Sequence, residues 1–187
     1  MKKLPSYYEN PIDNIIYKFI APTSHQLDCL TPNFITLLSF ISGLLSMYYY
    51  KNNNVEYSTI LFFISYFFDV LDGFHARRKN ICSTFGSYFD HISDLVISFI
   101  FLFITYQKYK DYKYFYHICG TTLISVIIMY LHLSLRELYH EKDNSIFLNV
   151  FNLKNKESIK YLSFTRYFGT GTFMLLYCII IFYSKYL

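Results

Sequence analysis

Four aspartates lie close together in the sequence, where one long apolar run ends and the next begins. Asp69 and Asp72 are three residues apart, and Asp90 and Asp94 are four residues apart. Spacings of three and four residues place the members of each pair on one face of a helix. Because the segment between the pairs is short, we expect two antiparallel neighbouring helices whose carboxylates meet at one depth.

These acids would lie at the edge of a membrane, where charge is costly. A lone acidic side chain in a bilayer costs about 2.5–3.5 kcal/mol on insertion scales, and four neighbouring carboxylates also repel one another. Protonation, or neutralisation by Arg77, could relieve part of this cost. Two divalent ions, Mg²⁺ or Mn²⁺, would match four carboxylates more completely, because hard cations prefer oxygen ligands. Such a pair of ions suits phosphoryl transfer.

Small residues lie between the two acidic pairs. Gly73, Ala76 and Gly86 would let helix backbones approach closely and would leave room for a ligand beside the acids. A cation channel can also use acidic rings, but it would not need small residues at these positions. We therefore favour a metal site that binds a substrate.

The elements that would carry these acids are transmembrane helices. Hydrophobic residues make up 53% of the 187 residues and charged residues only 16%. A spanning helix needs about 20 mainly apolar residues. Five runs qualify, two of them only if the aspartates are allowed at one end; they are 32–50, 57–68, 95–107, 114–135 and 167–184. A sixth segment, 146–153, is too short and too interrupted to cross.

The predicted fold is therefore all-α, a polytopic transmembrane bundle of about five to six spans. We expect one integral-membrane domain over 1–187, with a cytoplasmic or interfacial segment at 1–30 and the bundle at 31–187. Thr31 can cap the first span and Pro32 suits its first turn. Before it, an apolar stripe predicts a helix lying on the membrane surface, or else packed on the bundle; it consists of Ile12, Ile15, Ile16, Phe19 and Ile20.

Basic residues orient the bundle and limit the partners. If the N-terminus is cytoplasmic, 12 of the 17 Lys and Arg residues lie on that side, together with the loop after Arg77. The acids would then face the cytoplasm. The net charge of +4 is small and no long basic tract is present, so a nucleic-acid partner is not expected.

At this point the pattern becomes recognisable. It resembles the signature of the CDP-alcohol phosphatidyltransferase (class I) family, D-x2-D-G-x2-A-R-x8-G-x3-D-x3-D. All eight positions match in identity and spacing, and they are Asp69, Asp72, Gly73, Ala76, Arg77, Gly86, Asp90 and Asp94. The segment LTPNFIT at 30–36 also resembles the opening helix of the family. The resemblance covers the first two thirds of the chain.

The resemblance implies a phospholipid-synthesising transferase that moves a substituted phosphate group from a CDP-linked donor to an acceptor hydroxyl and releases CMP. It implies that Asp69, Asp72 and Asp90 hold two Mg²⁺ or Mn²⁺ ions, and that Asp94 shares one ion and acts as the catalytic base. Donor binding would fall to the other four signature positions, which are Gly73, Ala76, Arg77 and Gly86.

The identity of the substrates stays open at this stage. The short chain favours CDP-diacylglycerol with a small-alcohol acceptor. The alternatives are a CDP-choline or CDP-ethanolamine donor with the lipid diacylglycerol, and a catalytically silent membrane homologue. Family members typically have six or more spans. The smaller number of spans expected here affects the assignment of the acceptor more than that of the catalytic residues. Membrane lipids are expected partners, and the resemblance is also compatible with a homodimer.

Overall fold

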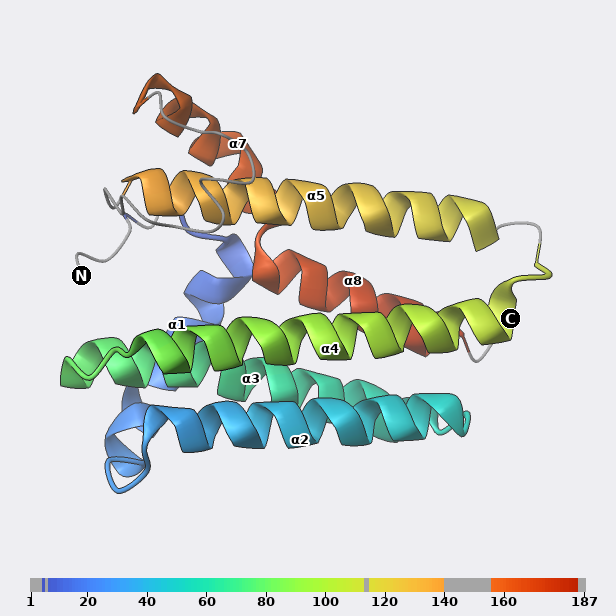
Figure 1. Ribbon diagram of the computed structural model, residues 1–187, viewed down its shortest axis with the longest axis horizontal. Coiled ribbons are helices and arrows are strands. Elements are labelled where there is room, and N and C mark those ends of the chain that lie inside the picture. Colours follow the sequence, from blue (N-terminus) through green and yellow to red (C-terminus); the bar gives the residue numbers. More distant parts are fainter. Residues whose placement is uncertain (1–4, 6, 113–114, 140–155, 185–187) are drawn as a thin grey trace. The chain divides into compact units, whose positions relative to one another are not determined.

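The computed structural model describes residues 5, 7–112, 115–139 and 156–184 (Figure 1). This part of the chain is helical and contains no strand. The elements in order are α1 Pro11–Gln26, α2 Pro32–Lys51, α3 Val55–Lys79, α4 Thr84–Tyr109, α5 Phe115–Tyr139, the 3₁₀ helix η1 Lys156–Tyr161, α7 Leu162–Thr165, the 3₁₀ helix η2 Arg166–Phe168 and α8 Thr170–Tyr183.

Two compact units make up the fold, and each is considered by itself. The first contains residues 1–15 and 116–173, and the second contains residues 16–115 and 174–187. The four aspartates all belong to the second unit.

Local signals explain where the helices beside the aspartates begin and end. The Thr31 side chain accepts a hydrogen bond from the backbone N–H of Phe34, and Pro32 follows it, so the predicted start of α2 is confirmed. At the end of α3, Asn80 adopts a left-handed conformation with φ 56°. Ser83 then caps α4 by accepting from the backbone N–H of Gly86. This short turn makes α3 and α4 antiparallel.

Helix α2 is the element against which α3 and α4 pack. The backbones of both helices approach α2 more closely than they approach each other. Ser39 and Ser65 exchange hydrogen bonds between their hydroxyls and each other's backbone carbonyls, at 2.8 and 2.9 Å. Helices α3 and α4 are antiparallel as expected, and their backbones pack mainly on α2 rather than on each other.

Aromatic side chains pack α8 against α4 and α2 in the second unit. Tyr177 of α8 stacks on Phe101 of α4, with ring centroids 4.0 Å apart, and Phe101 also stacks on Tyr50 of α2. All three residues are buried. A hydrogen bond from the Tyr109 hydroxyl to the carbonyl oxygen of Ser184 adds a polar tie. The last part of α8 is thereby fixed to α2 and α4.

The predicted amphipathic helix is present as α1, but its apolar stripe is divided. Ile16 and Ile20 are buried in the second unit, whereas Ile15 is 56% exposed and Phe19 63% exposed. The end of α1 is held to α3, because the Ser24 hydroxyl lies 3.0 Å from Nδ1 of the buried His75. Helix α1 is thus both packed on neighbouring helices and apolar on its open side.

In the first unit, the start of the chain is bound to residues far along the sequence. The Asn10 side-chain amide donates to the carbonyl oxygen of Arg166 at 2.7 Å and to Oγ1 of Thr172 at 2.8 Å. Glu9 pairs with Arg136 of α5 at 3.6 Å. These contacts satisfy buried polar groups within the unit.

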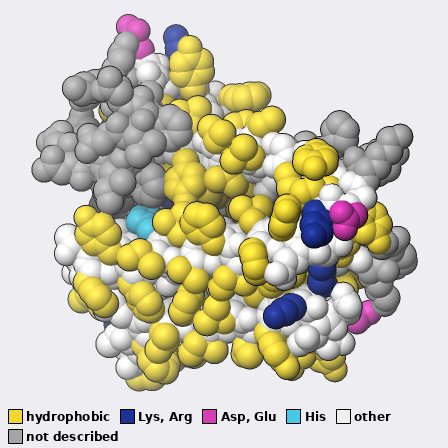
Figure 2. All heavy atoms as spheres, turned by 45° about the vertical axis from the view of Figure 1, so that its right-hand side comes forward, with side chains coloured by type: hydrophobic (Ala, Val, Ile, Leu, Met, Phe, Trp, Pro, Cys, Tyr) yellow, Lys and Arg dark blue, Asp and Glu magenta, His cyan; other side chains and the backbone are white. Residues whose placement is uncertain are grey.

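Among the described residues, three helical segments are long and apolar enough to cross a membrane. They are Val55–Lys79, Thr84–Tyr109 and Glu157–Tyr183. They overlap three of the five predicted spans, as expected for an integral, multi-pass membrane protein. Figure 2 shows hydrophobic side chains spread over one face of the molecule. Segment 146–153 lies outside the described residues.

Candidate metal centre

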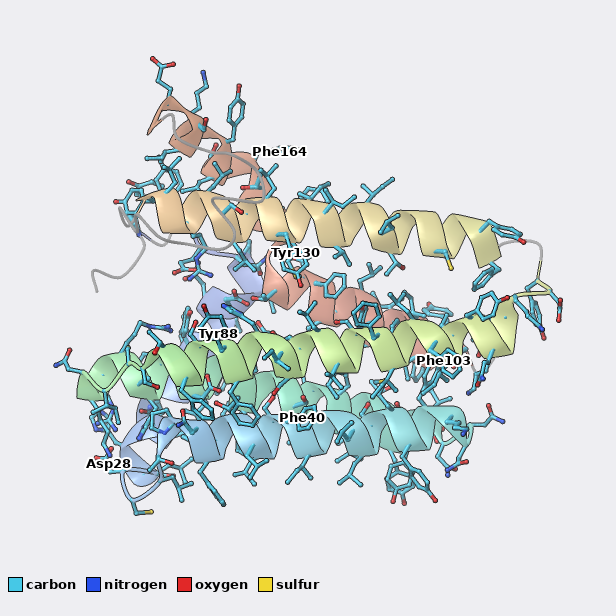
Figure 3. The ribbon with its side chains drawn as sticks, in the orientation of Figure 1. Asp28, Phe40, Tyr88, Phe103, Tyr130 and Phe164 are labelled. Atoms are coloured by element: carbon cyan, nitrogen blue, oxygen red, sulfur yellow. The ribbon has the colours of Figure 1, made fainter. Side chains whose placement is uncertain are left out.

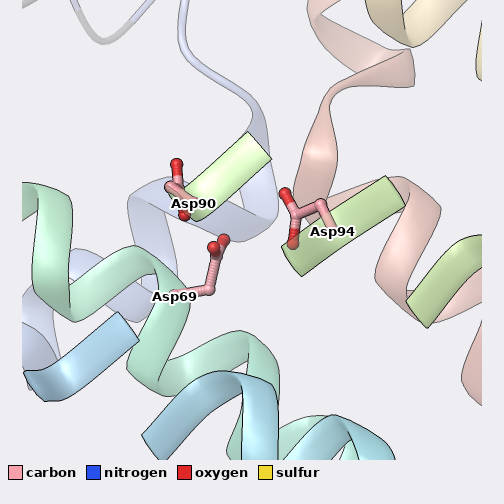
Figure 4. A group of neighbouring side chains, drawn as sticks. All are labelled: Asp69, Asp90 and Asp94. Atoms are coloured by element: carbon pink, nitrogen blue, oxygen red, sulfur yellow. The ribbon is translucent and has the colours of Figure 1, made fainter. Parts of the chain in front are cut away.

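Three carboxylates converge between α3 and α4. Asp69 comes from α3, and Asp90 and Asp94 come from successive turns of α4. One oxygen from each carboxylate lies within 4.8 Å of those of the other two, and Figure 4 shows the three side chains turned toward a common space. Three oxygen ligands at this separation can hold a metal ion.

The polarity of this space fits a hard cation. Oδ1 of Asp90 is buried and has no hydrogen-bond partner among the described residues, while its Oδ2 lies 3.9 Å from Nδ1 of His91. A buried acceptor without a partner is costly, and a divalent ion would satisfy it. Asp69 and Asp90 are half-buried and Asp94 is exposed, so the group is accessible from one side.

The fourth predicted ligand, Asp72, lies outside this group of three. Its side chain is on α3, one turn after Asp69, and is only 5% exposed. The hydroxyl of Thr36 on α2 donates a hydrogen bond to its Oδ2. Asp72 is therefore oriented by a neighbouring helix.

The signature residues that follow Asp72 are arranged along the last turns of α3. The guanidinium of Arg77, an exposed residue, folds back over Gly73, and a Cβ at Gly73 would lie 3.0 Å from Nη1 of Arg77. Ala76 is half-buried on the same helix. The glycine thus leaves the space that the arginine head occupies.

Gly86 allows a close approach between α4 and the start of α2. A Cβ at this position would lie 2.8 Å from Oδ1 of Asn33 and 3.0 Å from the Ser83 hydroxyl. Both are closer than a carbon atom can normally come to them. The first turns of α2 therefore reach both halves of the motif, through Thr36 to α3 and through Asn33 to α4.

Sequence reasoning missed Thr36. Its signal was its place at the end of the LTPNFIT segment, 30–36, which resembles the opening helix of the family. What the sequence could not indicate is which helix the Thr36 side chain faces.

Two basic residues at the end of α3, Arg78 and Lys79, contact the segment between α1 and α2. Arg78 donates to the Ser24 hydroxyl at 2.9 Å and forms an ion pair with Asp28, which lies between α1 and α2 (Figure 3). Lys79 lies 3.8 Å from the same carboxylate. The hydrogen bond from Arg78 holds the pKa of Asp28 below its ordinary value. These contacts fix the end of α3 to the segment that precedes α2.

Comparison with known proteins identifies the family. The family model described as CDP-alcohol phosphatidyltransferase matches residues 29–185, so the chain belongs to this family. The match includes the described helices that carry the aspartates. The predicted family and enzyme class, a transferase of phospholipid biosynthesis, are thereby confirmed. No solved structure matches the chain.

Two curated relatives show related activities in their names. The chain is 28% identical over 150 residues to the CDP-diacylglycerol–glycerol-3-phosphate 3-phosphatidyltransferase of Wigglesworthia glossinidia brevipalpis, a match that covers 79% of each chain. It is 35% identical over 65 residues to the CDP-diacylglycerol–serine O-phosphatidyltransferase of Bacillus subtilis (strain 168). That second match covers 35% of this chain and 37% of the Bacillus enzyme.

Membership of the family implies a CDP-alcohol donor and an alcohol acceptor. The family is metal-dependent, and the group formed by Asp69, Asp90 and Asp94 is suited to hold the metal.

Proposed function

We propose that this protein transfers a phosphatidyl group from CDP-diacylglycerol to the hydroxyl of a small alcohol and releases CMP. The observation that carries the proposal is the convergence of Asp69, Asp90 and Asp94 from the two helices that bear the complete signature. Both relatives described above are named for CDP-diacylglycerol, which supports this donor.

The four aspartates are proposed to hold two Mg²⁺ or Mn²⁺ ions. Asp69, Asp90 and Asp94 contribute the oxygens that already lie close together, and Asp72 contributes a further carboxylate, which Thr36 holds through Oδ2. When bound, divalent ions neutralise charge on the donor diphosphate and on the departing phosphate.

Asp94 is proposed as the catalytic base. It is the exposed member of the group of three, so an acceptor from the aqueous side can reach it. The acceptor oxygen forms a bond to the phosphorus that carries diacylglycerol, and its proton passes to the Asp94 carboxylate. The bond from that phosphorus to the bridging oxygen breaks, and CMP leaves with the electron pair.

The remaining signature residues are proposed to bind the donor. Gly73, Ala76 and Gly86 present little side-chain bulk, and a nucleotide would occupy the space beside them once the side chains of Arg77 and Asn33, which lie there in the structure, move aside. The exposed guanidinium of Arg77 can bind a phosphate oxygen of the donor.

The membrane arrangement is proposed to be that of one domain over 1–187 with about five to six spans. Helix α2 and the apolar helix Thr122–Arg136 would add to the three candidate spans. The open side of α1, with Ile15 and Phe19, would lie on the cytoplasmic surface, where the active site also faces. Membrane lipids are the expected surroundings, and a homodimer is compatible with this arrangement.

The test is a donor and acceptor panel with purified protein in detergent or lipid discs. With Mg²⁺ or Mn²⁺, CDP-diacylglycerol and a suitable small alcohol should give CMP and a new phospholipid, measured by mass spectrometry. Product only from CDP-choline or CDP-ethanolamine with diacylglycerol would replace the proposed donor. No CMP from any pair would indicate a silent homologue.

A further inference from the structure

We infer that Thr36 of α2 is a positioning residue of the metal centre, which orients Asp72 so that one of its oxygens stays available to a divalent ion. The inference rests on the proposed function of the aspartates as metal ligands. It assigns a role to a helix that contributes no acidic side chain of its own.

The contact is a buried hydrogen bond between two helices. Thr36 is 4% exposed and Asp72 is 5% exposed, and the Thr36 hydroxyl meets Oδ2 of Asp72. The same hydroxyl lies 3.1 Å from the carbonyl oxygen of Pro32. A hydroxyl has one hydrogen, and Asp72 bound to a metal ion would be a carboxylate, the stronger acceptor, so the hydrogen would then be directed to Asp72.

This hydrogen bond restricts the orientation of the Asp72 carboxylate. An aspartate on a helix can rotate about two side-chain torsions, and α3 alone does not fix them. With Oδ2 held by Thr36, rotation of the carboxylate is restricted, and Oδ1 is the oxygen inferred to bind an ion. Ligands fixed in this way bind metals more tightly, because less freedom is lost on binding.

Thr36 can act as a fixed point because α2 is held in register with α3. Ser39, one turn after Thr36, and Ser65 exchange the hydrogen bonds described above. Ser46 and Ser58 repeat this arrangement farther along, at 2.7 and 2.9 Å. Small polar residues at a membrane helix interface give close packing and hydrogen bonds that resist sliding.

Helix α2 also contacts the other acid-bearing helix. Asn33, one turn before Thr36, lies against Gly86 at the start of α4. Through Thr36 and Asn33, the start of α2 therefore contacts both helices that carry the aspartates.

The experiment compares three substitutions in the full-length protein. Thr36→Val removes the hydroxyl and keeps the shape, and Thr36→Ser keeps the hydroxyl. Thr59→Val is the matched control, because the Thr59 hydroxyl donates to the Val55 carbonyl of its own helix, at 2.9 Å. Each variant is titrated with Mn²⁺ by thermal unfolding, and with Mn²⁺ and CDP-diacylglycerol by CMP release.

The Mn²⁺ midpoint is the concentration that gives half of the maximal rise in unfolding temperature or in CMP release. Thr36→Val should raise this midpoint by about tenfold or more, the usual range for residues that orient metal ligands. Thr36→Ser should restore most of the wild-type value, and Thr59→Val should match the wild type. A wild-type Mn²⁺ midpoint for Thr36→Val would overturn the inference, and so would an equal rise for Thr59→Val.

A second comparison keeps the test decisive if Thr36→Val does not fold. Thr36→Cys keeps a similar size but donates weakly, so it should also raise the Mn²⁺ midpoint, and an unchanged midpoint would overturn the inference. The experiment distinguishes the transferase function from the positioning role of Thr36. If Mn²⁺ binding depends on Thr36 but no CMP is released, the proposed function is contradicted and the positioning role is supported.

Discussion

Asp69 of α3 and Asp94 of α4 belong to different helices, yet each places a carboxylate oxygen within 4.8 Å of the other. Asp90, one turn before Asp94, completes the group with a buried oxygen that lacks a partner among the described residues. An ion at this position would bridge two helices whose backbones pack mainly on α2. Occupancy of the site should therefore stabilise the folded protein.

The first prediction concerns removal of metal. Chelation should lower the unfolding temperature, and Mg²⁺ or Mn²⁺ should restore it, because a ligand that binds only the folded state stabilises it by about 2.7 kcal/mol at 100 times its Kd. Asp90→Asn should remove most of this shift. Asp111→Asn, an exposed acid beyond the end of α4, is the control and should keep it. The measurement is thermal unfolding with and without chelator, and equal shifts for both variants would exclude the site.

The second prediction concerns the base. Asp94→Asn should lower the rate of CMP release at saturating metal by about 10²–10⁴-fold, the usual contribution of a general base. Some metal-dependent stabilisation should remain, since Asp69 and Asp90 are unchanged. Turnover is followed by CMP release alongside Mn²⁺-dependent unfolding. A rate equal to wild type would show that another group accepts the proton.

The third prediction concerns Gly86. Gly86→Ala should be destabilising relative to Gly120→Ala by about 0.5–1.5 kcal/mol, the cost of forcing a side chain off its preferred torsion, because its Cβ would lie 2.8 Å from Oδ1 of Asn33 and that side chain must shift. Gly120→Ala in α5 is the matched control: a Cβ there meets nothing within 4 Å, so this change should be neutral or stabilising. Denaturant unfolding of both variants measures the difference.

A double variant shows whether Asn33 is the cause of that destabilisation. Asn33→Ala removes the atom that Gly86→Ala would contact, so the two changes together should destabilise less than their separate effects predict. Additive effects would mean that the start of α2 does not constrain α4.

The convergence of the acids could be predicted from sequence because spacing on a helix is local information. The separations within each pair, and the short turn from Asn80 to Ser83, are sufficient to bring the two faces to one end of an antiparallel pair. The start of α2 at Thr31 was predictable for the same reason. Each of these features depends on residues that are near neighbours in the chain.

The features that could not be predicted depend on which helices meet. Spacing places Asp69 and Asp72 on one face of α3, but that face is broad enough for Asp69 to meet α4 while Asp72 meets Thr36 of α2. The stripe of α1 was divided in the same way, because its neighbours cover Ile16 and leave Ile15 open. Periodicity identifies a face and does not identify its partner.

The last prediction is the pH dependence of the turn that holds α3 to the segment before α2. Hydrogen bonding to Arg78 lowers the pKa of Asp28 below its ordinary value of 3.8. A carboxyl with a lowered pKa in the folded state contributes stability above its unfolded pKa, and that contribution is lost as the pH falls through the folded value. The unfolding temperature of the wild type should therefore exceed that of Asp28→Asn at neutral pH, and this difference should narrow below pH 3.8.

The difference in unfolding temperature should be small and should shrink with added salt, because the Asp28 carboxylate is exposed to solvent. A difference between the wild type and Asp28→Asn that stays constant with pH would mean that the ion pair with Arg78 does not form in solution.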